Sequence, residues 1–145
     1  MSGNAIGREG LRVAELNPDS QLGRRLAADK EISGGLVTEL AHDGDPLAGE
    51  VLDEIGRRLG HGLVGLINTF NPEVIVIGGG AARGGDMLLA PARAVVAERA
   101  LEPAREVVRI EPAHYGDEAG MMGAALLAFD HLDGTARPTR SEPSP

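Results

Sequence analysis

The residues best suited to chemistry in this sequence are three consecutive glycines, Gly78, Gly79 and Gly80. They follow a run of β-branched residues, Val74–Ile77, which is typical of a buried strand in a parallel sheet. Glycine has no Cβ, so the backbone can turn sharply there and another molecule can approach it closely. Ligands of open α/β sheets bind at the carboxyl ends of the strands. The local pattern allows two readings, a nucleotide site and a tight strand-to-helix turn, and it favours the turn because glycine-rich turns after strands are common.

A second glycine-rich segment, Ser33-Gly34-Gly35, precedes an apolar helical pattern. Ser33 is suited to cap that helix, because a serine oxygen can accept a hydrogen bond from a backbone N–H of the first turn. The segment could also line a pocket. Both readings stay open at this point.

No catalytic or metal-binding constellation is visible in the sequence. The four histidines are scattered without ligand spacing, and the chain has no cysteine, which excludes thiolate metal sites and cysteine nucleophiles within it. No lysine of the kind found in phosphate-binding loops follows the three glycines. We therefore assign no catalytic residue and no metal ligand.

The composition of the chain argues against nucleic acid and membranes as binding partners. The chain has 145 residues, 42% of them hydrophobic, with a net charge of -8 and no basic block, which argues against a nucleic-acid surface. No apolar run approaches the ~18 residues of a membrane span, and the first residues lack the order of a signal peptide. A cytoplasmic protein that binds neither membrane nor nucleic acid is expected.

The strongest prediction of secondary structure is a helix from Pro46 to Phe70, capped by Asp45. Acid-before-base pairs at i,i+4 indicate an exposed face. Five glycines interrupt this helix, each costing about 1 kcal/mol relative to alanine. Close packing of a neighbouring helix or a second subunit would compensate for them, so we expect a homo-oligomer and keep an assembly scaffold as a hypothesis.

Shorter elements complete the prediction. Asn71 ends the long helix because Pro72 restricts it. The remaining expected elements are helices over Ser2–Leu16, Gln21–Ala28, from Ser33, Pro91–Ala100 and Glu118–Leu132, and a second strand over Val107–Ile110 that ends at Pro112. Small residues in the last helix indicate close packing.

Only two strands are detectable, and both look buried on both faces. Two parallel strands do not make a stable sheet alone. The sequence therefore predicts an α/β fold that is mostly helical and incomplete, over residues 1–132, with a disordered tail over residues 133–145.

Several motifs, in order, resemble the carboxyl-terminal half of ROK-family sugar kinases (repressor, open reading frame, kinase), especially bacterial glucokinases. Ile32–Asp45, ISGGLVTELAHDGD, is similar to the family's I-T-G-x-x-V-x-x-A-x-x-G-D segment. Leu59–Gly80 resembles its long helix and adenosine-motif strand, and Ala119–Ala128 its final glycine-alanine helix. Ser2–Ala5 resembles the residues after its cysteine-rich zinc loop.

The resemblance implies part of an actin-like, ribonuclease H-like ATPase fold. ATP would lie with its adenosine against Gly78, Gly79 and Gly80, and Ser33 and Gly34 would form a weaker wall. ATP, Mg²⁺ and a hexose would be the ligands of the complete enzyme, which converts glucose to glucose 6-phosphate.

The family's catalytic aspartate, phosphate loop, sugar-binding segment and zinc cysteines have no counterpart in this sequence, so we expect the chain alone to be inactive. The alternative implied by the family is the ligand-sensing half of a ROK repressor.

Overall fold

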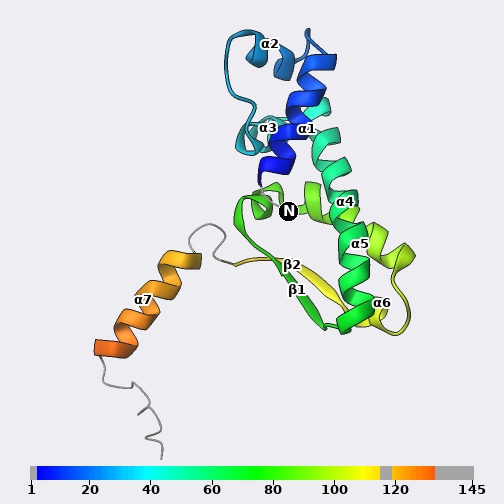
Figure 1. Cartoon of the computed structure of the whole chain (residues 1–145), viewed down its shortest axis with the longest axis vertical. Helices are drawn as coiled ribbons and strands as arrows, with labels where there is room; N and C mark the ends of the chain where they lie inside the picture. Colours follow the sequence, from blue (N-terminus) through cyan, green and yellow to red (C-terminus); the bar gives the residue numbers. More distant parts are fainter. Residues whose placement is uncertain (1–2, 115–118, 133–145) are drawn as a thin grey trace, which may run out of the picture.

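The computed structural model describes residues 3–114 and 119–132. The two strands lie below the amino-terminal helices in Figure 1, and the two longest described helices pack against each other. The elements are α1 (Gly3–Leu16), α2 (Gln21–Ala27), α3 (Gly34–His42), α4 (Pro46–Phe70), β1 (Val74–Ile77), the 3-10 helix η1 (Gly79–Gly84), α5 (Gly85–Arg99), α6 (Ala104–Val107), β2 (Arg109–Pro112) and α7 (Ala119–Leu132).

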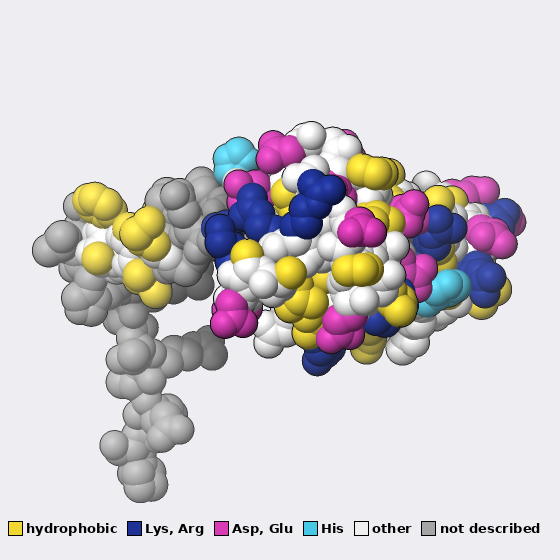
Figure 2. Space-filling model, turned by 90° about the horizontal axis from the view of Figure 1, so that it is seen from above, with side chains coloured by type: hydrophobic (Ala, Val, Ile, Leu, Met, Phe, Trp, Pro, Cys, Tyr) yellow, Lys and Arg dark blue, Asp and Glu magenta, His cyan; other side chains and the backbone are white. Residues whose placement is uncertain are grey.

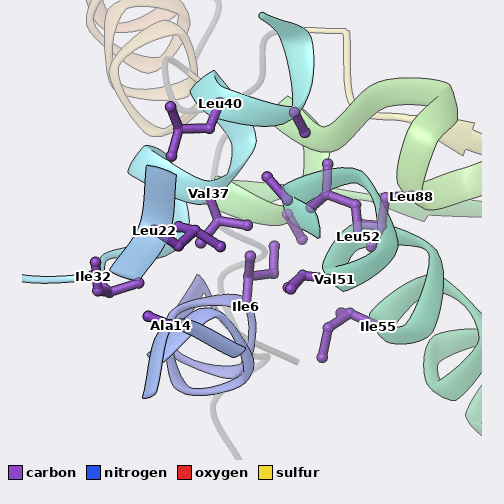
Figure 3. Close-up of a cluster of buried hydrophobic side chains, with 13 residues drawn as sticks. Ile6, Ala14, Leu22, Ile32, Val37, Leu40, Val51, Leu52, Ile55 and Leu88 are labelled. Atoms are coloured by element: carbon purple, nitrogen blue, oxygen red, sulfur yellow. The ribbon is translucent and has the colours of Figure 1, made fainter. Parts of the chain in front are cut away.

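The first core joins α1, α2 and α3 to the amino-terminal half of α4. Its side chains are aliphatic and come from separate elements that converge in Figure 3. Ile6, Leu22 and Leu52 are among its fully buried members. Burying each such side chain contributes about 1.5–3 kcal/mol, so the aliphatic core compensates for the low aromatic content.

The long helix α4 has the predicted bounds, Pro46–Phe70. An oxygen of Asp45, Oδ1, accepts a hydrogen bond from the Ala48 backbone N–H at 2.9 Å, and Pro46 occupies the first turn. The expected ion pairs Asp53–Arg57 and Glu54–Arg58 are both present. Asn71 ends the helix in the left-handed conformation, φ 46° and ψ 51°, rather than the extended one expected before a proline. Asparagine tolerates that conformation, which explains the difference.

Two of the five glycines of α4 are explained by α5. A Cβ atom at Gly56 would lie 2.3 Å from the Leu88 carbonyl oxygen, and one at Gly60 would lie 2.7 Å from the Ala92 carbonyl oxygen. The neighbouring-helix alternative is thus confirmed at these positions. At Gly49, Gly62 and Gly65 a Cβ would meet no atom of the described residues within 4 Å.

Strands β1 and β2 pair in parallel, with Val74 opposite Arg109 and Ile77 opposite Pro112. The expectation that both strands are buried on both faces is wrong. On β1, Val74 and Val76 are 38% and 61% exposed, whereas Ile75 and Ile77 pack against the second core with residues of α4, α5 and β2. Only one face of this sheet is covered by the described residues.

The elements around β2 begin at different residues from those predicted. Val107 ends the short helix α6, so the strand starts at Arg109. Helix α5 starts at Gly85 rather than at Pro91. Gly85 has φ 51°, and Pro91 lies in the second turn of the helix, where it forfeits one intrahelical hydrogen bond.

Helix α7 stands apart from the other described elements in Figure 1. Hydrophobic side chains lie exposed on it at the left of Figure 2, and Met121, Leu127 and Phe129 are each more than 60% exposed. The close packing expected of its small residues is not found at Gly123, where no other described residue comes within 4 Å of a Cβ. Ser2, where the first helix was expected to start, and the tail over residues 133–145 lie outside the described residues.

Candidate functional site

A cavity of about 750 Å³ lies between α1, the segment that joins α2 to α3, and η1. Three of the five predicted site residues, Ser33, Gly34 and Gly80, line it together. Ser33 and Gly80 are 47 residues apart along the chain, so the fold brings the two glycine-rich segments to one place. Gly78 lines a separate apolar cavity of about 160 Å³ beside Ile6 and Ile55, and Gly79 lines neither of the two cavities.

The glycine turn after β1 has an open backbone. Gly79 has φ 70°, a conformation that L-residues adopt rarely, and it starts the 3-10 helix. All three glycines are exposed. Of the described atoms, none lies within 4 Å of a Cβ placed at Gly79 or Gly80, and the nearest to Gly78 is Ala113 Cβ at 3.7 Å. The turn is therefore accessible to another molecule.

Ser33 has the capping role expected of it. Its Oγ accepts a hydrogen bond from the Leu36 N–H at 3.2 Å, and its own backbone is extended. The same residue lines the cavity, so capping and pocket lining are compatible here. Helix α3 thus begins at the cavity wall, with the positive end of its dipole there.

Helix α1 fixes the position of that wall. A Cβ at Gly7 would lie 3.0 Å from the Ile32 carbonyl oxygen and 3.1 Å from the Gly34 backbone nitrogen. The glycine lets α1 lie directly against the backbone that precedes α3. The Ser33–Gly34 segment is held by this contact as well as by its own cap.

Sequence reasoning missed the charged residues of the cavity. Arg8, Lys30 and Arg83 line it, together with one carboxylate, Glu31. On α1 the cavity is lined by positions 4, 7, 8 and 11, which recur at helical spacing. This spacing is the one sequence pattern that could have indicated which side of α1 faces the cavity. That signal identifies one face of a helix, but it gives no indication of the partners across the cavity.

The described residues contain no group of three or more side chains suited to hold a metal ion. His42 has an ordinary structural role, since its Nδ1 lies 3.0 Å from the Thr38 carbonyl oxygen of the same helix. In the described part of the chain, no helix is long and apolar enough to cross a membrane. Glu118, the expected first residue of the last helix, lies outside the described residues.

Comparison with known proteins identifies the family. The family model described as "ROK family" matches residues 1–131. The chain belongs to the ROK family. The resemblance seen in the sequence motifs is thereby confirmed.

Relatives within the ROK family include both enzymes and regulators. The glucokinase of Thermotoga maritima is 29% identical over 128 residues, which cover 88% of this chain and 40% of that protein. The glucokinase of Halalkalibacterium halodurans is 36% identical over 107 residues, 71% of this chain and 32% of that protein. The Escherichia coli transcriptional repressor Mlc is 29% identical over 117 residues, 81% of this chain and 29% of the repressor.

Solved ROK structures share the fold. A glucokinase from Streptomyces griseus in complex with glucose and AMPPNP aligns with a TM-score of 0.73 and 30% identity, over 87% of this chain and 42% of that one. A ROK transcriptional regulator, a homologue of E. coli Mlc, aligns with a TM-score of 0.73 and 31% identity, over 92% of this chain and 33% of the regulator. The predicted fold class, part of an actin-like ATPase, is confirmed. This chain spans less than half the length of these relatives.

Proposed function

We propose that this chain is the nucleotide-binding part of an ATP-dependent ROK glucokinase, which converts glucose to glucose 6-phosphate in the complete protein. The observation that carries the proposal is the cavity shared by Ser33, Gly34 and Gly80. Its volume of about 750 Å³ lies within the range of about 300–1,000 Å³ that is usual for small-molecule sites.

The bare backbone of Gly80 leaves room for a ligand at this cavity. Its φ is not positive, and within the described structure nothing comes within 4 Å of the place its Cβ would occupy. Gly56 and Gly60, by contrast, are required by a neighbouring helix. A nucleoside could therefore pack directly against the Gly80 backbone.

The Streptomyces griseus glucokinase supports the identity of the ligands, since AMPPNP is an analogue of ATP. Mg²⁺ would reach the site with the nucleotide phosphates, because the described residues offer no acidic cluster of their own. The general base that accepts the proton of the sugar hydroxyl and the groups that hold the sugar would come from other polypeptide of a complete ROK enzyme. The chain alone would bind ATP without transferring phosphate.

A second candidate function is the ligand-sensing part of a ROK repressor. It is favoured by the match to Mlc and by the alignment with the ROK regulator, which covers 92% of this chain. The open glycine turn favours the kinase, because a cavity with bare backbone suits a nucleotide.

A chimeric enzyme tests the proposal. Residues 1–131 of this chain would replace the matching segment of the Thermotoga maritima glucokinase, and the reference would be the same chimera with the corresponding Mlc segment. We expect the first chimera to phosphorylate glucose with ATP and to exceed the reference. A first chimera that folds, as judged by circular dichroism, and has no more activity than the reference would contradict the kinase assignment.

A further inference from the structure

The cavity between α1, η1 and the start of α3 carries positive charge in an acidic chain. Arg8 on α1, Lys30 before α3 and Arg83 on η1 line it with a single carboxylate, Glu31. The whole chain has a net charge of -8. Cations from three separate elements therefore meet at one cavity, which is an arrangement that favours an anionic ligand.

Two of these cations are not used to hold the fold. Arg8 and Lys30 are exposed, and neither side chain makes a hydrogen bond or an ion pair with another residue that the structure describes. Other arginines have such partners: Arg12 pairs with Glu9 one turn away, and Arg57 with Asp53. The side chains of Arg8 and Lys30 are free to turn toward a ligand in the cavity.

The start of α3 adds positive potential of a different origin. Ser33, Gly34 and Gly35 line the same cavity, and Gly34 begins a helix of nine residues. The first backbone N–H groups of a helix lack intrahelical acceptors and favour an anion. The Ser33 hydroxyl accepts a hydrogen bond from the Leu36 N–H, so this N–H has a partner within the first turn of α3.

Apolar residues occupy another part of the same lining. Leu11 and Leu26 contribute side chains, and Gly80 contributes bare backbone. A ligand with one apolar, planar part and one anionic part matches this division. A nucleoside phosphate has both.

We propose that Arg8 and Lys30 bind the phosphate groups of the nucleotide, while its nucleoside lies against the Gly80 backbone. The inference rests on the proposed nucleotide-binding function and assigns two residues to it. It makes the preferred ligand a nucleoside di- or triphosphate rather than a free nucleoside.

Calorimetric titration of the full chain with ATP, ADP and adenosine tests this assignment. We expect ATP to bind more tightly than adenosine. Arg8→Ala and Lys30→Ala should each weaken ATP binding about tenfold, the scale of one lost charge-assisted hydrogen bond, and leave adenosine binding unchanged. Added salt should weaken ATP binding more than adenosine binding.

Arg99→Ala is the matched control, since Arg99 is an exposed cation at the end of α5 outside the cavity lining. It removes the same charge and should leave ATP binding unchanged. Lys30→Glu provides a second variant, which should weaken ATP binding further than Lys30→Ala. Circular dichroism checks that each variant is folded.

The outcomes separate this assignment from the proposed function. ATP and adenosine binding with equal affinity, with Arg8→Ala and Lys30→Ala matching the wild type, would overturn the role of the two cations and leave nucleotide binding intact. No binding of either ligand would overturn both. If Arg99→Ala lost as much ATP affinity as Arg8→Ala and Lys30→Ala, the weaker binding would be explained by the net charge of the chain, and the assignment would be overturned.

Discussion

Gly56 of α4 lies directly against the carbonyl group of Leu88 in α5. A Cβ atom at position 56 would stand 2.3 Å from that oxygen, closer than any side chain can be placed without movement of a helix. The Leu88 side chain is itself fully buried in the first core. The junction between α4 and α5 therefore depends on a missing methyl group, and α5 in turn follows the glycine turn that borders the cavity.

Replacing Gly56 by alanine should destabilise the chain. The added methyl group forces the two helices apart, and overpacking of this kind typically costs about 1–3 kcal/mol, which outweighs the gain of about 1 kcal/mol in helix propensity. Urea denaturation followed by circular dichroism measures the change. Gly49→Ala is the control, because none of the described atoms crowds that position, and it should be neutral or stabilising. Equal stability of the two variants would contradict this packing.

Asp45→Ala should lower the free energy of unfolding by about 1 kcal/mol, the usual cost of losing an N-cap. The buried carboxylate accepts the Ala48 N–H at 2.9 Å, and without it that N–H stays unsatisfied at the start of the longest helix. Asp45→Asn keeps an acceptor oxygen and should recover most of the loss. Thermal or chemical denaturation of the three proteins provides the comparison, and an Asn variant as weak as the Ala variant would argue against capping.

The buried carboxylate of Glu9 should make stability depend on pH. Hydrogen bonds from Arg12, at 2.6 and 2.9 Å, lower the pKa of Glu9 below its ordinary value of 4.5, against the opposing effect of burial, and the charges of Arg12 and Arg58 lower it further. A lowered pKa in the folded state stabilises the fold above the unfolded-state pKa. That stabilisation is lost as the pH falls through the folded-state value.

Glu9→Gln should therefore be less stable than the wild type at pH 7, and the difference should shrink once the pH drops below about 4. Denaturation at a series of pH values measures it. Glu15→Gln, which changes an exposed carboxylate on the same helix, should show a much smaller pH-dependent difference. A difference for Glu9→Gln that stays constant from pH 7 to pH 3 would contradict the ion pair.

The sequence predicted correctly those helix and strand positions that depend only on neighbouring residues. Asp45 and Pro46 mark the start of α4 by chemistry within one turn, and Ser33 does the same for α3. The run Val74–Ile77 becomes β1 as predicted, and the two strands pair in parallel. Ser33, Gly34 and Gly80 were predicted from their local sequence, and the fold places them at one cavity.

Features that depend on tertiary contacts were not predictable in the same way. Helix α5 starts at Gly85, a glycine with positive φ, so Pro91 lies inside the helix and does not mark its start. The exposure of Val76 depends on what covers the outer face of the sheet, which alternation along one strand does not reveal. Arg93 donates two hydrogen bonds to the Ile110 carbonyl oxygen, at 3.0 and 2.7 Å, and so ties α5 to β2 across 17 residues. Homo-oligomer formation stays a prediction.

Titration of the full chain with Mg²⁺–ATP, beside the variant Gly80→Val, tests the central claim most directly. We predict saturable binding by the wild type and at least tenfold weaker binding by Gly80→Val, because its side chain would project where the nucleoside lies. Its stability should change little, since nothing in the described structure crowds that position. Saturable binding with the same affinity in both proteins, or no binding by the wild type, would contradict the nucleotide site at Gly80.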